Sequence, residues 1–359
     1  MMTRVASLIV PSLLLLLAAV AARAETVADH VLREILQRYG APGGVLLVSG
    51  PDRRELAVAG VADRRSGRPV TPDTRFHIAS TGKMLTAVAT LSLVQDGRIA
   101  LSDPALPLVG HPDAGRLANL DRATVADLLD HRSGVPDCLR NSATVTQRHP
   151  GPRWTAEEVI RLAPCRGPTP PGRYAYSNTN YILLGHILER VDGRPFADAF
   201  ARRVLEPAGM DSTSLGADPN DPRVARGYRS PDAAGNRADA SLYAYSSPLG
   251  DAPVTTTAAD LERFAFALFR QPGRLLAPEM VGAMVEDRSA EDEEGYGYGV
   301  VVEHSDWGPR WGHSGRYAGF RSELWYYPQH DTLTVLMMNG DENTDDDVGD
   351  LIARPFFTP

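Results

Sequence analysis

Apolar residues near the start of the chain recur at two different spacings, which predict a helix followed by a hairpin. Over residues 27–36 they return every three or four positions, and this helical pattern stops before Gly40. The runs GVLLVS at 44–49 and ELAVAGV at 55–61 are short and rich in Val and Leu, and a Gly-Pro-Asp sequence follows the first run. Two such runs joined by turn residues predict an antiparallel hairpin.

A second helix is predicted over residues 80–95, where an Asp-Gly pair follows the last turn. Its apolar face consists of Met84, Leu85, Val88 and Leu91, which recur at helical spacing. Beyond it the pattern changes to helical patches broken by Pro and Gly, among them ATVADLLDHRSG, TAEEVIRLA and NYILLGHILERVDG. These patches predict a mostly helical lobe over residues 101–236.

The last third of the chain returns to strands. After the amphipathic helix TTTAADLERFAFALF come four β-like runs with short turns between them, YGYGVVVEH, PRWGHSG, FRSELWYY and TLTVLMMN. Consecutive strands of this kind pair antiparallel, and we expect the two hairpin-rich ends to share one sheet. The predicted fold class is α+β, an antiparallel β-sheet flanked by helices with an inserted mostly helical lobe. The α/β lobe comprises residues 25–100 and 237–359.

The first 24 residues have the pattern of a secretory signal. Arg4 precedes an apolar run from Val5 to Val20, and small residues end the segment at Ala24. Ser and Pro interrupt the apolar run, and no cysteine near its end offers a lipid anchor. We expect a signal peptide over residues 1–24, a domain over 25–359, no stable membrane anchor, and a periplasmic or secreted protein.

The charge and length of the chain limit its partners. Its formal net charge is −8 over 359 residues, which does not favour nucleic acid or anionic lipid. The length, without an internal repeat, suits one catalytic module made of two lobes. Its expected partner is a small-molecule or peptide substrate, and no sequence feature points to a particular oligomeric state.

Cys138 and Cys165 are the only cysteines. Export favours a disulfide between them over a metal site or a free thiol pair. The alternative is two buried unpaired thiols, because spacing alone does not show that the two Cα atoms approach within bonding range.

Two acidic stretches receive structural interpretations. AEDEEG at 290–295 is typical of a solvated loop. The stretch from Asp341 resembles a calcium loop at its first positions, but Asp346 stands where such a loop needs Gly and Ile352 where it needs Glu. Thr344 and Asp347 instead predict a capping box that opens the last helix.

Lys83 is the only lysine among 37 basic residues. A lysine can release its proton inside a protein, whereas an arginine in practice cannot. Ser80 stands three residues earlier, so on a helix its hydroxyl lies one turn from the amine. A desolvated lysine can activate a serine by taking its proton. By itself a Ser-x-x-Lys pair is more often structural, and codon bias toward arginine would also leave a single lysine.

Two further clusters change that interpretation. They are Tyr176-Ser177-Asn178, shortly after a Pro-Gly turn, and His313-Ser314-Gly315 on a predicted strand. In this order after Ser80-Thr81-Gly82-Lys83, the motifs resemble the serine β-lactamase and D-alanyl-D-alanine carboxypeptidase superfamily, nearest its class C and carboxypeptidase branch. The resemblance covers nearly all of residues 41–345. Its scaffold segments are GVADRRSGRPVTPDTRFHIAS, LLDHRSGVPD, YSNTNYILLGHILERVDGRPF, VLEPAGMDSTSLG and TTTAADLERF.

The resemblance implies a β-lactamase/transpeptidase-like fold and a role for each motif. Ser80 is expected to be the acylated nucleophile, with Lys83 lowering the cost of its deprotonation and Tyr176 acting as, or sharing, the general base. Backbone N–H groups of Ser80 and Arg316 are expected to form the oxyanion hole. Asn178 is expected to bind the substrate amide and to help hold Lys83.

The third motif departs from many β-lactamases of this superfamily, which have Lys where this chain has His313. Histidine is mostly neutral near pH 7, so a permanent cation for a substrate carboxylate is missing next to Ser314 and Gly315. Arg316 is our hypothesis for its replacement. The departure weakens the antibiotic-hydrolysis interpretation.

The expected function is that of an exported serine hydrolase, with D-alanyl-D-alanine carboxypeptidase-like amide hydrolysis as the favoured activity. The alternatives are a carboxylesterase or weak β-lactamase, and a non-catalytic penicillin-binding or sensor protein. The substrate is then a D-alanyl peptide, an ester or a β-lactam. No metal or organic cofactor is expected, and the zinc-binding motif His-Glu-x-x-His is absent. The Gly-x-Ser-x-Gly motif of the α/β-hydrolases is absent too. His131 and His77 are expected to be structural.

Overall fold

The structure is a computed structural model of the chain. It describes residues 24–138, 158, 165, 167–216, 218, 220–230, 235–242, 250–251, 254–289, 295–342 and 347–357. Residues 1–23 of the expected signal peptide, almost all of the patch TAEEVIRLA, residues 290–294 and the capping residue Thr344 lie outside the described part.

The main sheet combines both ends of the chain, as expected. Its strand order is β3-β2-β1-β10-β9-β8-β7, and every neighbouring pair is antiparallel. The first hairpin pairs with the last strand in a register that places Leu46 opposite Leu336. The strands are β1 Gly43–Ser49, β2 Arg54–Asp63, β3 Arg68–Pro69, β7 Val301–Ser305, β8 Gly308–Tyr317, β9 Phe320–Tyr327 and β10 Thr332–Met338.

Successive side chains of a strand point to opposite sides, and both faces of this sheet are covered. In β1, Leu46 and Val48 pack with helix α1 (Val27–Arg38) and helix α13 (Val348–Phe357). Val45 and Leu47 point the other way, into the large core shared with the remaining helices.

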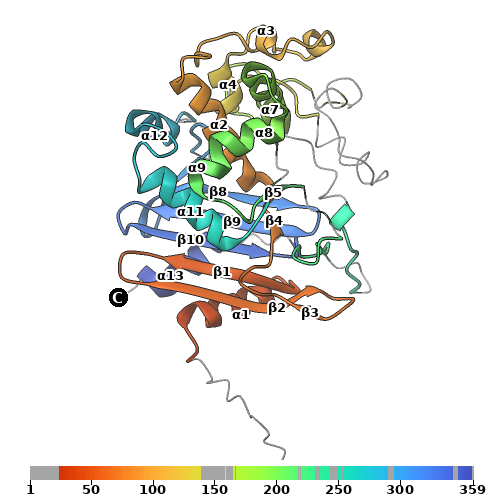
Figure 1. Cartoon of the computed structure of the whole chain (residues 1–359), viewed down its shortest axis with the longest axis vertical. Coiled ribbons are helices and arrows are strands. Elements are labelled where there is room, and N and C mark those ends of the chain that lie inside the picture. Colours follow the sequence, from red (N-terminus) through yellow and green to blue (C-terminus); the bar gives the residue numbers. More distant parts are fainter. Residues whose placement is uncertain are drawn as a thin grey trace, which may run out of the picture.

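Those helices form the second part of the molecule. Figure 1 shows α2, α3, α4, α7 and α8 gathered beyond β8, while α1 lies under β2 at the opposite end. A small sheet of order β4-β6-β5 joins the two parts. The elements are β4 Phe76–His77, η1 Ala79–Thr81, α2 Gly82–Gln95, α3 Ala105–Val109, η2 Ala114–Arg116, α4 Val125–Leu129, α7 Asn178–Asp192, α8 Phe196–Phe200, η3 Ala201–Leu205, α9 Glu206–Ala208, β5 Ser214–Leu215, β6 Val254–Thr256, α11 Ala258–Phe269 and α12 Pro278–Met284.

Two details differ from the sequence prediction. Helix α2 is buried on all sides over residues 82–93 rather than on one apolar face, because it packs against α7, α8 and β8 together. The strand expected from Tyr296 begins only at Val301. Gly299 has a φ of +74°, and the Gly297 N–H bonds to the Val300 carbonyl, so a turn occupies the first half of that run.

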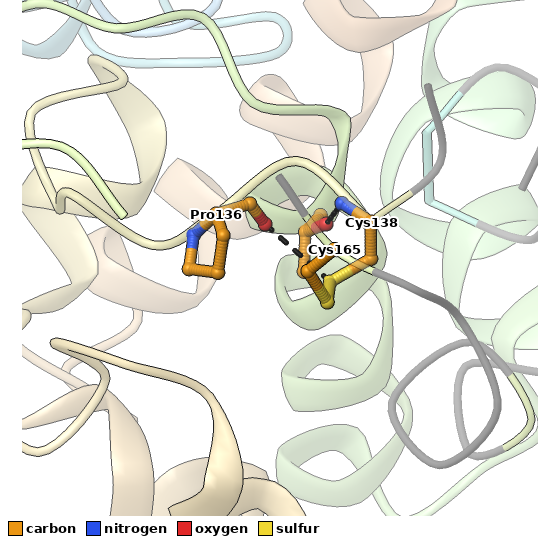
Figure 2. The surroundings of a disulfide bond; sticks show 4 residues. Pro136, Cys138 and Cys165 are labelled. Atoms are coloured by element: carbon orange, nitrogen blue, oxygen red, sulfur yellow. Dashed lines mark hydrogen bonds between the residues drawn. A yellow bond between two sulfur atoms is a disulfide. The ribbon is translucent and has the colours of Figure 1, made fainter. Parts of the chain in front are cut away.

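Cys138 and Cys165 form a disulfide, which confirms the favoured prediction and excludes two unpaired thiols. Figure 2 shows the joined sulfur atoms beside Pro136. Among the described helices, none is both long and apolar enough to cross a bilayer.

Candidate active site

Ser80 lies on the tight η1 turn at the start of the buried helix α2. The preceding Ala79 has a φ of +47°, a left-handed conformation that is costly for a residue with a Cβ. Thr81 ties the turn to the sheet, because its hydroxyl donates to the His313 carbonyl at 3.1 Å and shares a 2.8 Å hydrogen bond with Ser322. The surrounding structure therefore fixes a strained backbone that leaves Ser80 partly exposed.

Gly315 allows strand β8 to pass close to this turn. A Cβ at Gly315 would lie 2.3 Å from the Ile78 carbonyl oxygen and 2.9 Å from the Ser80 nitrogen. These distances are shorter than real Cβ contacts, so any side chain here would push the strand and the turn apart. The third motif thus lies against the first.

Lys83 is completely buried, and its amine lies within hydrogen-bonding reach of the nucleophile. Nζ lies 3.1 Å from Ser80 Oγ and 2.9 Å from Asn178 Oδ1. It also pairs with the buried carboxylate of Asp251. Burial alone would lower the pKa of Lys83, but the charge of Asp251, followed by Tyr176, holds that pKa above its ordinary value.

Asn178 begins helix α7 and connects Lys83 to a second buried acid. Its Oδ1 accepts from Lys83, so its Nδ2 is the donating end, and Nδ2 contacts Asp137 Oδ2 at 3.1 Å. Asp137 directly precedes the disulfide, and the Cys138 N–H donates to Thr179 Oγ1 at 2.9 Å. The disulfide thereby supports the end of the helix that carries Asn178.

Tyr176 lies over the amine, with its ring centroid 5.2 Å from Lys83 Nζ. Burial raises the pKa of its hydroxyl, while the charge of Lys83 and hydrogen bonds to Ser80 and Lys83 act to lower that pKa. The net shift is upward, so the resting side chain is a neutral phenol. Ser80, Lys83, Tyr176 and Asn178 therefore meet at one point.

His131 holds the segment that carries Tyr176. Its carbonyl accepts from the Ala175 N–H at 2.9 Å, its Nδ1 accepts from the Ser177 N–H at 3.3 Å, and its ring lies 4.3 Å from the Tyr176 ring. Burial lowers the pKa of His131 well below its ordinary value. His131 is thus a buried neutral support for Tyr176, in line with the structural role expected for it.

His313 is also buried and neutral. Burial, followed by the charge of Lys83, lowers its pKa to about 3. Its Nδ1 lies 2.6 Å from the Ser314 carbonyl, which can only accept, so the proton is on Nδ1. Nε2 then accepts from the Tyr296 hydroxyl at 3.1 Å. The third motif presents no positive charge at His313.

Ser314 and Arg316, which follow His313 on β8, are exposed, and Gly315 between them is buried. Arg316 is thus the exposed cation that follows the third motif. It pairs in register with Arg321 of β9.

Asp251 is the site residue that sequence reasoning missed. It lies 168 positions from Lys83 and belongs to none of the three motifs. A lone acid beside a glycine carries no sequence signal, so only the folded chain reveals the contact.

The chain belongs to the Beta-lactamase family, whose model matches residues 28–355. The expected superfamily and β-lactamase/transpeptidase-like fold class are therefore confirmed. Among solved structures, the penicillin binding protein from Bacillus halodurans matches with a TM-score of 0.76 and 26% identity, over 90% of this chain and 98% of that chain. The D-amino acid amidase from Ochrobactrum anthropi SV3 matches with a TM-score of 0.76 and 26% identity, over 91% and 95%.

A curated relative is the D-aminopeptidase of Brucella anthropi, which is 28% identical over 330 residues and 87% of this chain. The chain spans 58% of that relative. It spans 34% of the unguisins hydrolase ungD from Aspergillus violaceofuscus, to which it is 30% identical over 52% of its own length.

Proposed function

We propose that the protein is a serine hydrolase that cleaves an amide bond beside a D-residue through an acyl-enzyme on Ser80, in the manner of a D-alanyl-D-alanine carboxypeptidase. One observation carries the proposal: the completely buried amine of Lys83 lies 3.1 Å from Ser80 Oγ. Burying an amine costs free energy. A buried amine beside a serine hydroxyl can take the proton of that hydroxyl and so activate it as a nucleophile.

Acylation follows from this geometry. Ser80 Oγ attacks the substrate carbonyl carbon while its proton leaves toward Lys83 and Tyr176. The developing oxyanion is bound by the backbone N–H groups of Ser80 and Arg316, each worth about 3 to 4 kcal/mol in comparable sites. The leaving nitrogen takes a proton from the site, and water then hydrolyses the ester.

The neutral state of His313 favours an amide without a carboxylate, such as a D-amino acid amide, and leaves Arg316 to bind the carboxylate of a D-alanyl-D-alanine peptide or a β-lactam. With a pKa of about 3, this histidine gives no positive charge at neutral pH to a substrate carboxylate. The relatives named D-aminopeptidase and D-amino acid amidase support D-residue amides as the substrate class. Esters, and β-lactams turned over slowly, are alternative substrates of the same acyl-enzyme.

The first test is intact-protein mass after brief mixing with benzylpenicillin, for the wild type and for Ser80→Ala. We expect an adduct that needs Ser80 and persists for minutes. A panel then compares a D-alanyl-D-alanine peptide, a D-amino acid amide and their L-counterparts, and we expect turnover of a D-compound only. An absent adduct together with an inert panel would overturn the proposal, and an adduct without turnover would favour a penicillin-binding sensor.

We also propose that the protein is exported to the periplasm or secreted. The sequence of residues 1–24 supports this, as does the Cys138–Cys165 disulfide, because such bonds persist in oxidising compartments. The mass of the protein recovered from the host's cell envelope and medium tests it. A mature chain starting at Glu25 is expected, and an uncleaved protein confined to the cytoplasm would contradict export.

A further inference from the structure

Asp251 is held against Lys83 by the packing of its neighbour Gly250. The Gly250 carbonyl accepts from Thr86 Oγ1 of α2 at 2.9 Å. A Cβ on Gly250, which has a φ of +92°, would lie 2.3 Å from the Tyr181 carbonyl oxygen of α7. The backbone is thus wedged between the two helices that carry Lys83 and Asn178, and this fixes the position of Asp251.

The contacts of Lys83 suit two protonation states. As an ammonium it has three N–H donors, and three acceptors lie within 3.1 Å of Nζ, namely Ser80 Oγ, Asn178 Oδ1 and Asp251 Oδ1. As a neutral amine it donates to Asn178 and Asp251 and accepts the Ser80 proton with its lone pair. The same contacts therefore persist in both forms. An ammonium at Lys83 can accept the Ser80 proton only if it first gives one of its own protons to another group.

The geometry points to Asp251 as a positioning residue that keeps Lys83 in the ammonium form at rest and accepts one of its protons as Lys83 takes the proton of Ser80. This inference rests on the proposed acylation of Ser80 and names the final acceptor of its proton.

The proposed step balances in atoms and charge. The bond from Ser80 Oγ to its proton breaks and a bond from Oγ to the carbonyl carbon forms, with the carbonyl electron pair moving onto oxygen. The Ser80 proton goes to Lys83 Nζ, and one Nζ proton goes to Asp251. A carboxylate and a neutral serine are replaced by a carboxylic acid and an oxyanion, while Lys83 is an ammonium before and after.

The proton returns when the amide breaks. As the oxyanion collapses, the leaving nitrogen takes the Tyr176 hydroxyl proton, Lys83 replaces it, and Asp251 gives its proton back to Lys83. This route uses Tyr176 as a neutral phenol, the form that its burial favours. It ends with the carboxylate and the ammonium that were present at the start.

Other titratable groups lie around the pair, and burial favours the neutral form of the histidines and tyrosines among them. These groups are His131, His313, Tyr176, Tyr181, Tyr296 and the acid Asp137, which acts on Asp251 through its charge.

The test is the pH dependence of acylation, measured as the burst of nitrophenolate from p-nitrophenyl acetate and checked by the mass of the acetylated chain. In the wild type we expect the burst rate to fall at acidic pH as Asp251 becomes protonated, so the acid limb of the pH profile reports on Asp251. In Asp251→Asn the acid limb belongs to Lys83, so we expect it to move upward. The rate measured two pH units below the new limb should be about 100-fold under its plateau. The rate should recover above that limb.

A merely structural role predicts another result. The rate of Asp251→Asn would then fall by one factor at every pH with the limb unmoved, and that result, or a wild-type profile, would overturn the inference. Asp137→Asn is the matched control, because Asp137 contacts Asn178 rather than Lys83. Its charge raises the pKa of Asp251, so its removal should move the limb downward and never upward.

A second variant carries the test if Asp251→Asn does not fold. Asp251→Glu keeps the carboxylate and should keep the wild-type limb with a lower plateau, whereas a limb shifted upward in this variant would overturn the inference. Failure of the proposed function has a different signature from failure of this inference. The wild type would then give no burst and no acetylated chain beyond those of Ser80→Ala.

Discussion

The backbone of Gly315 lies directly against the turn of Ser80, so that a methyl group added at Gly315 would stand 2.9 Å from the Ser80 nitrogen. Gly315→Ala should therefore push β8 away and displace the N–H of Arg316. We expect the acylation rate to fall by at least about 100-fold, the cost of one oxyanion donor. The nitrophenolate burst measures this loss. Gly282→Ala is the control, because a Cβ there has no neighbour within 4 Å; an unchanged burst in Gly315→Ala would contradict the assignment.

Lys83→Arg should abolish acylation and preserve the fold. A guanidinium keeps the positive charge beside Asp251 but cannot release a proton at any working pH. The expected loss is at least about 1,000-fold, as for removal of a general base. Circular dichroism checks the fold, and mass spectrometry with benzylpenicillin checks the adduct. Acylation at the normal rate by this variant would remove Lys83 from the mechanism.

Arg316→Ala should discriminate between substrates by charge. The side chain is exposed beside the third motif, where His313 gives no cation. We expect KM for a carboxylate-bearing substrate to rise about 3- to 10-fold, less at high salt, with KM for a neutral ester unchanged. Arg122→Ala, another exposed arginine, is the control. Equal effects on both substrates would show that Arg316 does not bind the carboxylate.

His313 should make the fold less stable as the pH falls. Its folded pKa of about 3 lies below the unfolded value of about 6.5, so only the unfolded chain takes up a proton between pH 7 and pH 5. That uptake costs about 2 kcal/mol of unfolding free energy over this window. Asp130 acts with the opposite sign, because burial, followed by Asp127, raises its pKa to about 7.

The contribution of His313 is therefore measured by difference. Urea unfolding of the wild type and of His313→Gln at pH 7 and pH 5 should show a loss on acidification that is about 2 kcal/mol smaller in the variant. Equal losses would mean that His313 takes up its proton in the folded protein as well.

The disulfide should support both stability and activity. Closing a loop of 27 residues contributes about 3 to 4 kcal/mol by chain entropy, and Cys138 also holds Thr179 beside Asn178. Dithiothreitol should therefore lower Tm and slow acylation in the wild type. It should change neither quantity in a variant with both cysteines replaced by serine. A reduced wild type that keeps its full rate would separate the bridge from the site.

Local patterns were sufficient to predict much of the fold and the site. The Val- and Leu-rich run of β1, the helical spacing in α1 and the Ser80-x-x-Lys83 pair each depend on neighbours a few positions apart. They can therefore be interpreted without knowledge of the fold. The same holds for Asn178, which lies on the first turn of a strongly periodic helix. Their motifs also carried the family assignment.

Long-range packing decided the rest. The sequence of α2 contains an apolar face, but only the fold shows that α7, α8 and β8 cover its other sides. His313 carries no sign of its pKa, which depends on burial by distant segments. Asp251 meets Lys83 because Gly250 fits between two helices, and no period links residues 168 positions apart. The sequence by itself determined which groups could react, and tertiary burial decided their charges and partners, since hydration is lost only when distant segments pack together.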